Sequence, residues 1–218
     1  MLTVYATARS ANGRKVLAVC RELGLEPEIR EVDVYRGEGR RPEYLAVNPS
    51  GRIPALVDAG TLIVESNAIL VYLSEAHGAG RLWADDPAGR ARISSWLFWE
   101  SAHWQPVTAL VLGPFVGHRL RPDVVAAAPA PDFGDARLAA VVATLEAALD
   151  AGPFLAGARL TLADFSVAGM LTYFRAARFP FAAHPRLRGW YERIEALESW
   201  RATADPLWDG GTGDAGSD

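Results

Sequence analysis

The chain has 218 residues with 22 Lys and Arg against 26 Asp and Glu, and this net charge of −4 excludes a nucleic-acid binder that depends on a strongly basic surface. Half of the residues are hydrophobic and 22% are charged, which fills a core, excludes wholesale disorder and suits one or two domains. The longest uncharged apolar stretch, residues 102–116, contains two prolines and is shorter than the roughly 18 residues of a transmembrane helix. Met1 leads into an apolar segment without the features of a secretory signal, so we expect a cytoplasmic protein.

The cysteine and histidine content predicts neither a disulfide nor a metal centre. Cys20 is the only cysteine, and it lies on the apolar stripe of a predicted helix, where a packing role is expected. The four histidines are scattered along the chain: His77, His103, His118 and His184. Their spacing demands no metal, so no metal cofactor is expected. Basic charge is almost all arginine, Lys15 being the only lysine.

Residues 1–78 predict a small mixed sheet with helices on its faces. The elements in chain order are a strand at 2–5, a helix at 13–23, a strand at 28–34, a short helix at 43–47, hairpin strands at 55–58 and 61–64, and a helix at 66–77. The first strand, helix and strand form a βαβ unit, so its two strands should pair in parallel through a right-handed crossover. Ser66 is the expected N-cap of the last helix.

The rest of the chain alternates nowhere like a strand and predicts helices only. A linker at 79–87 precedes helices at 88–116, 135–149, 161–174 and 185–197. The first of these should bend near Pro106 or break at Gly113-Pro114. Thr161 and Asp164 have the spacing of a capping box. The predicted organisation is therefore an α/β domain (1–78), a linker (79–87), an all-α domain (88–208) and a flexible, Gly-rich tail (209–218).

The turn and proline at residues 48–54 form the first motif with a chemical reading. Proline cannot donate a ladder hydrogen bond, so Pro54 belongs at the start or edge of a strand. If the Ile53-Pro54 bond is cis, the Ile53 N–H and C=O face outward and can pair with an extended peptide. The alternative is an ordinary trans proline that opens the strand, which is the commoner state of such bonds.

Glu65 and Ser66 form the second motif, at the start of a predicted helix. Free N–H groups and the helix dipole favour an anion there, and the Ser66 N–H and hydroxyl could hold a carboxylate. Glu65 could pair with the ammonium of the same ligand, so that the two residues read an α-amino acid head group. The alternative is that Ser66 only caps the helix and Glu65 only complements its dipole.

Together these motifs resemble the cytosolic glutathione S-transferases, of a bacterial type with serine or asparagine where other classes have a catalytic tyrosine or cysteine. The resemblance rests on the strand at 2–5 with its Ser- and Asn-containing loop, the segment 48–58, Glu65-Ser66, and the helix cap at 161–166. It covers the chain to about residue 200. It implies a thioredoxin-like domain followed by an all-helical domain, with glutathione as co-substrate and no metal.

The resemblance also implies roles for particular residues. Ile53, before a cis Pro54, would pair with the cysteinyl part of glutathione, while Glu65 and Ser66 would hold its γ-glutamyl end. A basic residue is needed near the glycyl carboxylate, with Arg52 as first choice and Arg40 as second.

The loop after the first strand should supply the group that stabilises the glutathione thiolate. Ser10 is the first choice and Asn12 its rival, while a cap of the following helix is the alternative role of Ser10. Tyr5 lies inside the strand and is expected in the core.

A stripe along the long helix could wall a pocket for the second substrate. Its candidates are Trp99, His103, Trp104 and Phe115. The alternative is that the stripe packs in the helical core or in a dimer interface. The leading hypothesis is a glutathione transferase acting on a small electrophile, and the rivals are a glutathione-dependent disulfide reductase and a non-catalytic glutathione-binding scaffold. A homodimer is expected, through the helix at 66–77 and the helices at 88–116.

Overall fold

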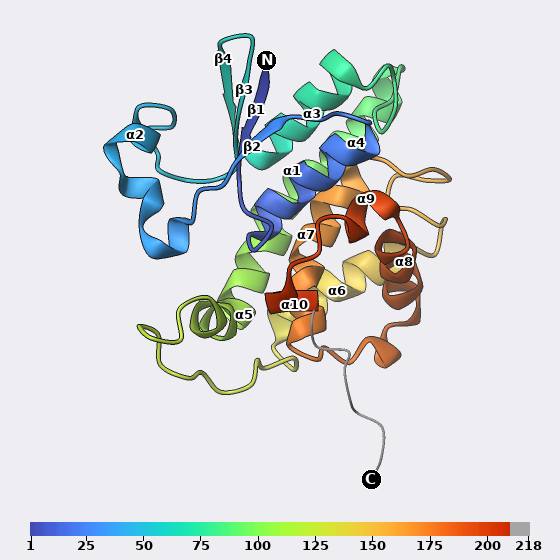
Figure 1. The fold of residues 1–218 in the computed structure, drawn as a ribbon. Helices are drawn as coiled ribbons and strands as arrows, with labels where there is room; N and C mark the ends of the chain where they lie inside the picture. Colours follow the sequence, from blue (N-terminus) through green and yellow to red (C-terminus); the bar gives the residue numbers. More distant parts are fainter. Residues whose placement is uncertain (210–218) are drawn as a thin grey trace.

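The computed structural model describes residues 1–209, in which a four-stranded sheet with its helices precedes a region of helices (Figure 1). The strands are β1 (Leu2–Tyr5), β2 (Glu28–Arg30), β3 (Ala55–Asp58) and β4 (Thr61–Val64). They lie in the order β2-β1-β3-β4, with β1 and β2 parallel and the other pairs antiparallel. The predicted parallel first pair and the predicted hairpin are therefore confirmed.

Strand β2 is shorter than the prediction of 28–34. It ends at Arg30, and a 3-10 turn occupies Val34–Arg36. The Asp33 carboxylate accepts hydrogen bonds from the backbone N–H groups of Tyr35 (3.0 Å) and Arg36 (3.2 Å). A short polar side chain that bonds to the next peptides favours a turn over a strand, which accounts for the early end. A second 3-10 turn, Glu38–Arg40, follows at once.

Three helices accompany the sheet: α1 (Ala11–Glu22), α2 (Pro42–Leu45) and α3 (Ser66–His77). Helix α1 begins at Ala11 rather than at residue 13 because Ser10 caps it, its Oγ accepting from the Gly13 N–H at 3.3 Å. Gly24 follows the helix with a positive φ of 73°, as its expected position after the helix end requires.

The second part of the described chain is helical. Its helices are α4 (Pro87–Trp99), α5 (Gln105–Leu120), α6 (Ala136–Ala148), α7 (Leu162–Ala176), α8 (Pro185–Glu195), α9 (Glu198–Arg201) and α10 (Pro206–Asp209), with a 3-10 turn at Phe181–Ala183. A π-helical turn, Glu100–Trp104, joins α4 to α5 next to Pro106, which is one of the two places where a bend was expected. Helix α5 continues through Pro114, so the alternative break at Gly113-Pro114 is wrong.

Helix α7 joins the two parts of the molecule, since it packs against α1 on one side and α4 on another (Figure 1). Its N-terminus carries the predicted capping box of Thr161 and Asp164. The Asp164 carboxylate also accepts from the Trp190 indole N–H (2.9 Å) and the Leu155 N–H (2.9 Å), which ties α8 and the preceding loop to the same point. The observed architecture confirms the predicted fold class.

The chain ends, as far as the structure describes it, with α10 against α7. Asp209, expected at the start of a flexible tail, is the last residue of this helix, and residues 210–218 lie outside the described part. Within residues 1–209, no helix is long and apolar enough to cross a membrane. The same residues contain no group of three or more His, Cys, Asp or Glu side chains placed to hold a metal ion.

Candidate active site

Two neighbouring cavities lie where the loops after β1 and β2 meet α3, α4 and α5. The larger, here called the Ile53 cavity, has a volume of about 450 Å³. The smaller, here called the Ser10 cavity, has a volume of about 220 Å³. Asn12 and Gln105 line both, so the two cavities adjoin.

The Ile53 cavity brings together most of the residues predicted to bind glutathione. Its lining includes Asn12, Arg52, Ile53, Pro54, Glu65 and Ser66. Arg40 does not line it, because this residue lies exposed in the second 3-10 turn. Of the two candidate bases for a carboxylate, the structure therefore places only Arg52 beside the other predicted residues.

The turn before Ile53 is held by a buried asparagine. The Asn48 amide donates from Nδ2 to the Arg52 carbonyl (2.8 Å), and the Tyr44 hydroxyl donates to the same oxygen (2.6 Å). The Ile53-Pro54 peptide is cis, the first of the two alternatives. Within residues 1–209, the Ile53 N–H and C=O have no hydrogen-bond partner, so both remain available to a ligand.

Glu65 and Ser66 stand at the start of α3 in an arrangement that differs from the prediction. Glu65, with φ of 67°, occupies the N-cap position and makes no side-chain cap bond. Ser66 is the first helical residue rather than the cap, and its hydroxyl donates to Asn12 Oδ1 at 3.3 Å. The exposed Glu65 carboxylate and the free N–H groups of a 12-residue helix thus face the same cavity, where they complement an ammonium and a carboxylate.

A buried ion pair lies directly behind Ser66. Lys15 Nζ lies 3.3 Å from Glu100 Oε2, and both side chains are fully buried. Asn67 bridges them: its Oδ1 accepts from Lys15 Nζ (2.9 Å), and its Nδ2 donates to Glu100 Oε2 (2.9 Å). Ser166 on α7 donates to the same Asn67 oxygen at 2.8 Å. Burial lowers the pKa of Lys15, and the Glu100 carboxylate opposes this shift. The hydrogen bonds of Asn67 hold the N-terminus of α3 against α1, α4 and α7.

The Ser10 cavity combines hydroxyl groups with an apolar wall. Ser10, Tyr35 and Tyr173 supply the hydroxyls, and the apolar lining includes Leu112 and Met170. Since the Ser10 oxygen accepts from the Gly13 N–H, its own proton stays free for another acceptor. Burial raises the pKa of the Tyr35 phenol, and the neighbouring Ser10 and Tyr173 hydroxyls oppose that rise. The cavity therefore offers hydroxyl donors beside a surface that suits an apolar molecule.

Comparison with known proteins assigns the family. Residues 9–76 match the model of the glutathione S-transferase N-terminal domain, and residues 112–193 match that of the C-terminal domain. Glutathione S-transferase 3 of Zea mays is 34% identical over 212 residues, covering 93% of this chain and 92% of that protein. The chain belongs to the glutathione S-transferase family.

Solved structures of the glutathione S-transferase family share this fold. Glutathione transferase F7 from Populus trichocarpa superposes with a TM-score of 0.82 at 27% identity, covering 95% of this chain and 99% of that one. A possible glutathione S-transferase from Rhodopseudomonas palustris superposes with a TM-score of 0.76 at 28% identity, covering 91% of this chain and 95% of that one.

The aromatic stripe predicted to wall a second-substrate pocket of this glutathione S-transferase lies elsewhere. Trp99, His103, Trp104 and Phe115 line neither cavity. Trp104 is fully buried, donates from Nε1 to the Val167 carbonyl (3.1 Å) and stacks on Trp99 and Phe174, so it belongs to the helical core. His103 is exposed. The π-helical turn at 100–104 changes the residues per turn, so a stripe drawn for an uninterrupted α-helix does not stay on one face.

Several residues of the site were absent from the sequence-based selection. Tyr35 follows a predicted strand that in fact ends early, so nothing placed it beside Ser10. Asn67 and Glu100 meet Lys15 only through the packing of α1, α3 and α4. One signal was present: Lys15 directly precedes the apolar run 16–20 of its helix, and a charged residue that such a run buries needs a partner.

Proposed function

We propose that this member of the family is a glutathione transferase that binds glutathione in the Ile53 cavity, stabilises its thiolate and transfers it to a small electrophile. The observation that carries the proposal is the convergence in one cavity of the unpaired Ile53 backbone, Glu65, and Ser66 at the N-terminus of α3. Each group complements a different part of a γ-glutamyl tripeptide.

In the proposed complex, the Ile53 N–H and C=O pair with the cysteinyl backbone as an added strand would. The Ser66 N–H receives the γ-glutamyl carboxylate at the helix N-terminus, together with the Ser66 hydroxyl once it turns from Asn12 Oδ1, and Glu65 pairs with the neighbouring ammonium. Arg52, which lines the same cavity, is the proposed partner of the glycyl carboxylate.

The chemical step requires the thiolate. A free thiol has a pKa of about 8.5, so a shift of two units, roughly 2.7 kcal/mol, makes the thiolate dominant at neutral pH. One hydrogen bond from the Ser10 hydroxyl to the anion, at roughly 1.5–3 kcal/mol, is enough to supply most of this. The proton leaves to solvent. The sulfur then forms a bond to the electrophilic carbon, and the leaving group departs with its electron pair.

Asn12 remains the rival donor for the thiolate. Its Oδ1 accepts from the Ser66 hydroxyl, which leaves the Nδ2 hydrogens free in a residue that borders both cavities. We propose that a serine or asparagine is the thiolate donor, and that the chain is of the bacterial type within the family. The Rhodopseudomonas palustris structure supports the bacterial type, whereas Glutathione S-transferase 3, compared above, comes from the plant Zea mays.

The Ser10 cavity is the proposed site of the electrophile. It adjoins the Ile53 cavity at Asn12, so a thiol bound in one faces a molecule bound in the other. Leu112, Met170 and the Tyr35 ring provide the apolar surface that such a substrate needs.

We also propose a cytoplasmic homodimer that acts in detoxification, as this family suggests. The exposed apolar side chain of Phe98 on α4 (76% exposed) and that of Val64 on β4 (38%) both lie at the rim of the Ile53 cavity. Apolar groups of this size exposed together favour a protein interface. The proposed interface joins α3 of one copy to α4 of the other.

Retention on immobilised glutathione and turnover of a chloronitrobenzene test the function. Absence of both would refute it, while turnover of hydroxyethyl disulfide without turnover of chloronitrobenzene would favour the reductase.

The thiolate donor is tested by following the ultraviolet absorbance of bound thiolate against pH. Ser10→Ala should raise the apparent pKa of bound glutathione by roughly one to two units, the equivalent of the lost hydrogen bond. Ser10→Thr keeps a hydroxyl that can also cap the helix, so its thiolate absorbance against pH should follow that of the parent protein. Ser95→Ala, on the exposed face of α4, is the matched control. A profile moved by Asn12→Ala and not by Ser10→Ala would assign the role to Asn12.

A further inference from the structure

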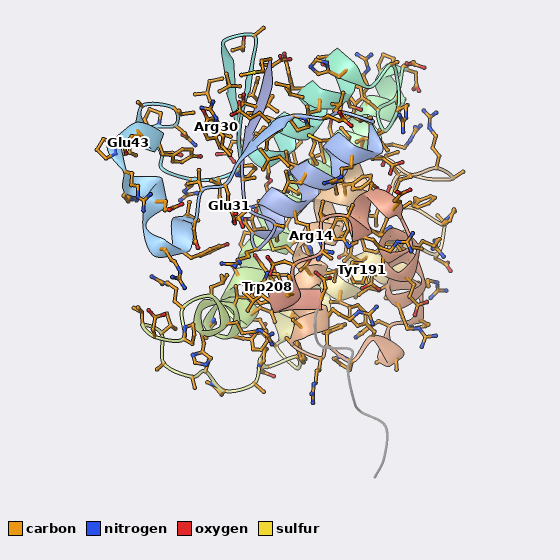
Figure 2. All side chains as sticks on the ribbon, viewed as in Figure 1. Arg14, Arg30, Glu31, Glu43, Tyr191 and Trp208 are labelled. Carbon is orange, nitrogen blue, oxygen red and sulfur yellow. The ribbon has the colours of Figure 1, made fainter. Side chains whose placement is uncertain are left out.

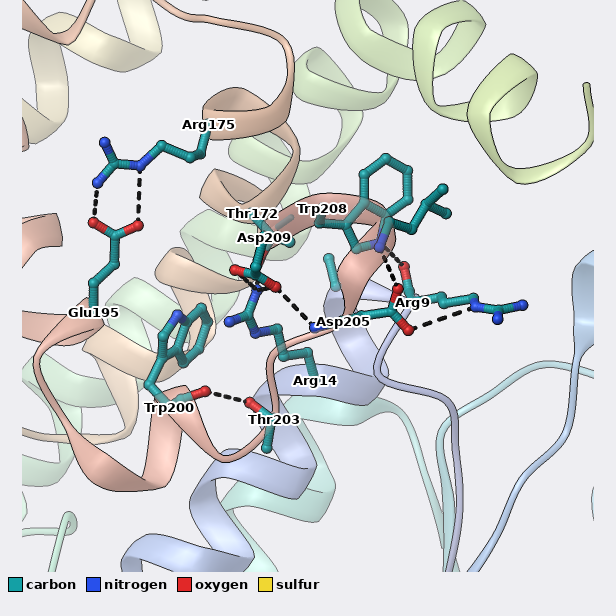
Figure 3. Close-up of polar contacts among 12 residues, drawn as sticks. Arg9, Arg14, Thr172, Arg175, Glu195, Trp200, Thr203, Asp205, Trp208 and Asp209 are labelled. Atoms are coloured by element: carbon teal, nitrogen blue, oxygen red, sulfur yellow. Dashed lines mark hydrogen bonds and ion pairs between the residues drawn. The ribbon is translucent and has the colours of Figure 1, made fainter. Parts of the chain in front are cut away.

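The C-terminal segment Asp205–Asp209 lies against the loop that carries Ser10 (Figure 3). Trp208 is 2% exposed, and its ring packs edge-on against Tyr173 of α7 with centroids 4.9 Å apart. The indole Nε1 donates to the Arg9 carbonyl at 2.9 Å. Arg119 covers the other side, its guanidinium 5.6 Å from the indole ring and bonded to the Leu207 carbonyl at 2.5 Å. The segment is therefore docked by specific polar contacts as well as by burial.

The peptides on both sides of Ser10 are held by these aromatic side chains. The Arg9 carbonyl accepts from Trp208 Nε1 and also from the Tyr173 hydroxyl at 3.2 Å. The Ala11 N–H donates to the same Tyr173 hydroxyl at 2.9 Å. By contrast, within residues 1–209 the Ser10 side chain makes one hydrogen bond that meets the geometric limits, from the Gly13 N–H at 3.3 Å, and that bond is long. The direction of the Ser10 hydroxyl thus depends chiefly on the backbone that Trp208 and Tyr173 fix.

A second attachment lies on α1, just beyond Ser10. Arg14 is 1% exposed, and its Nη1 lies 3.1 Å from both Asp209 carboxylate oxygens and 3.2 Å from Thr172 Oγ1. Its guanidinium stacks on the Trp200 ring at 4.6 Å. Figure 2 shows Arg14 and Trp208 near the same end of α1. The segment is therefore anchored at residues 9 and 14, on either side of Ser10.

We propose that Trp208 and Asp209 are positioning residues, which hold the Ser10 loop from behind so that the Ser10 hydroxyl points at the glutathione thiol. This inference rests on the proposed function. Neither residue lines the Ile53 cavity or the Ser10 cavity, so each acts through Ser10 and not on the substrate. The affinity for glutathione with a protonated thiol, which depends on Ile53, Glu65 and Ser66, should be independent of the tether.

The test is Trp208→Phe, which removes the Nε1–H and keeps an aromatic ring against Tyr173. The matched control is Trp83→Phe: Trp83 is also buried (7% exposed) and donates from Nε1 to Glu75 Oε1 at 3.0 Å, but it lies between α3 and α4, away from the tether. The measurements are the apparent pKa of bound glutathione, kcat against pH, the glutathione Kd and the thermal midpoint. Asp209→Asn, whose side chain is one-third exposed, tests the second anchor and replaces the first variant if that variant does not fold.

We expect Trp208→Phe to raise the apparent pKa of bound glutathione by roughly half a pH unit, with a roughly threefold fall in kcat below neutral pH. The glutathione Kd measured at about pH 5, where the bound thiol is protonated, should be unchanged. Asp209→Asn should move the profile in the same direction by less. Trp83→Phe should leave it unmoved.

Unmoved profiles in both tether variants would overturn the inference, even if their thermal midpoints fall. An equal shift in Trp83→Phe would overturn it too, because the effect would then be a general loosening of the fold. Failure of the parent protein to bind glutathione, or an unchanged apparent pKa of bound glutathione in Ser10→Ala, would instead refute the proposed function.

Discussion

The buried pair of Lys15 and Glu100 leads to a prediction about stability. In Lys15→Met, an apolar side chain of similar length replaces the ammonium, and the Glu100 carboxylate keeps only the hydrogen bonds from Asn67 (2.9 Å) and Ser101 (3.4 Å). Its other oxygen, Oε1, already lacks a partner among the described residues. Removing one member of a buried pair costs roughly 3–5 kcal/mol, because the remaining charge is left uncompensated. Against a typical stability of 5–15 kcal/mol, this is a large fraction.

Urea unfolding at pH 7 measures the effect as a lower midpoint with an unchanged slope. The double variant Lys15→Met with Glu100→Leu should recover most of the loss, since no buried charge then remains. The matched control is Arg188→Met, which breaks an exposed pair with Glu192 (3.6 Å) and should change the free energy of unfolding by no more than about 0.5 kcal/mol. A loss below about 1 kcal/mol in Lys15→Met, or a double variant no more stable than the single one, would refute the reasoning.

Three further predictions follow from single groups. Burial raises the pKa of Cys20 to about 12, so iodoacetamide at pH 8 should leave it unmodified until urea unfolds the chain; rapid labelling of the native protein would contradict its burial. The pKa of Asp58 is lowered by its hydrogen bond with His77 and, to a smaller extent, by that from Tyr72. The ionised carboxylate therefore stabilises the fold above its unfolded pKa near 3.9, and this contribution is lost as the pH falls through the lower folded pKa. His77→Ala should therefore move the acid-unfolding midpoint to higher pH, and an unmoved midpoint by circular dichroism would count against the pairing. Tyr35→Ala should lower kcat/KM for an aromatic electrophile roughly tenfold, with little change in the KM for glutathione. An equal fall in kcat/KM for glutathione and for the electrophile would show that the ring does not belong to the electrophile site.

The parts of the fold that the sequence predicts well are those fixed by local chemistry. The hairpin of β3 and β4 follows from alternating apolar residues around Ala59-Gly60, both of which have positive φ. The capping box of Thr161 and Asp164 needs only residues three apart, and it is observed. The Ile53 and Glu65 segments were likewise recognisable because each motif is short and contiguous.

The errors arise where contacts between distant segments, or irregular helical geometry, decide the outcome. Trp99, at the end of α4, and Trp104, at the end of the π-helical turn, line neither cavity, and no apolar period in the sequence reveals such a turn. Tyr35 reaches the Ser10 cavity only because β2 ends early. The tether of Trp208 to Arg9 joins residues at opposite ends of the chain, and neither sequence segment signals the other.

The burial of Lys15 has a consequence for covalent chemistry on this protein. It is the only lysine of the 218 residues and is inaccessible in the fold, so acetyltransferases, ubiquitin ligases and amine-reactive dyes have no lysine side chain to modify before unfolding. Apart from the α-amino group and the histidines, the cationic groups at the surface are guanidinium ions, which keep their protons beyond pH 12. Raising the pH from about 7 to about 11 therefore leaves the arginine charge intact, and lysine acylation becomes a direct reporter of global opening.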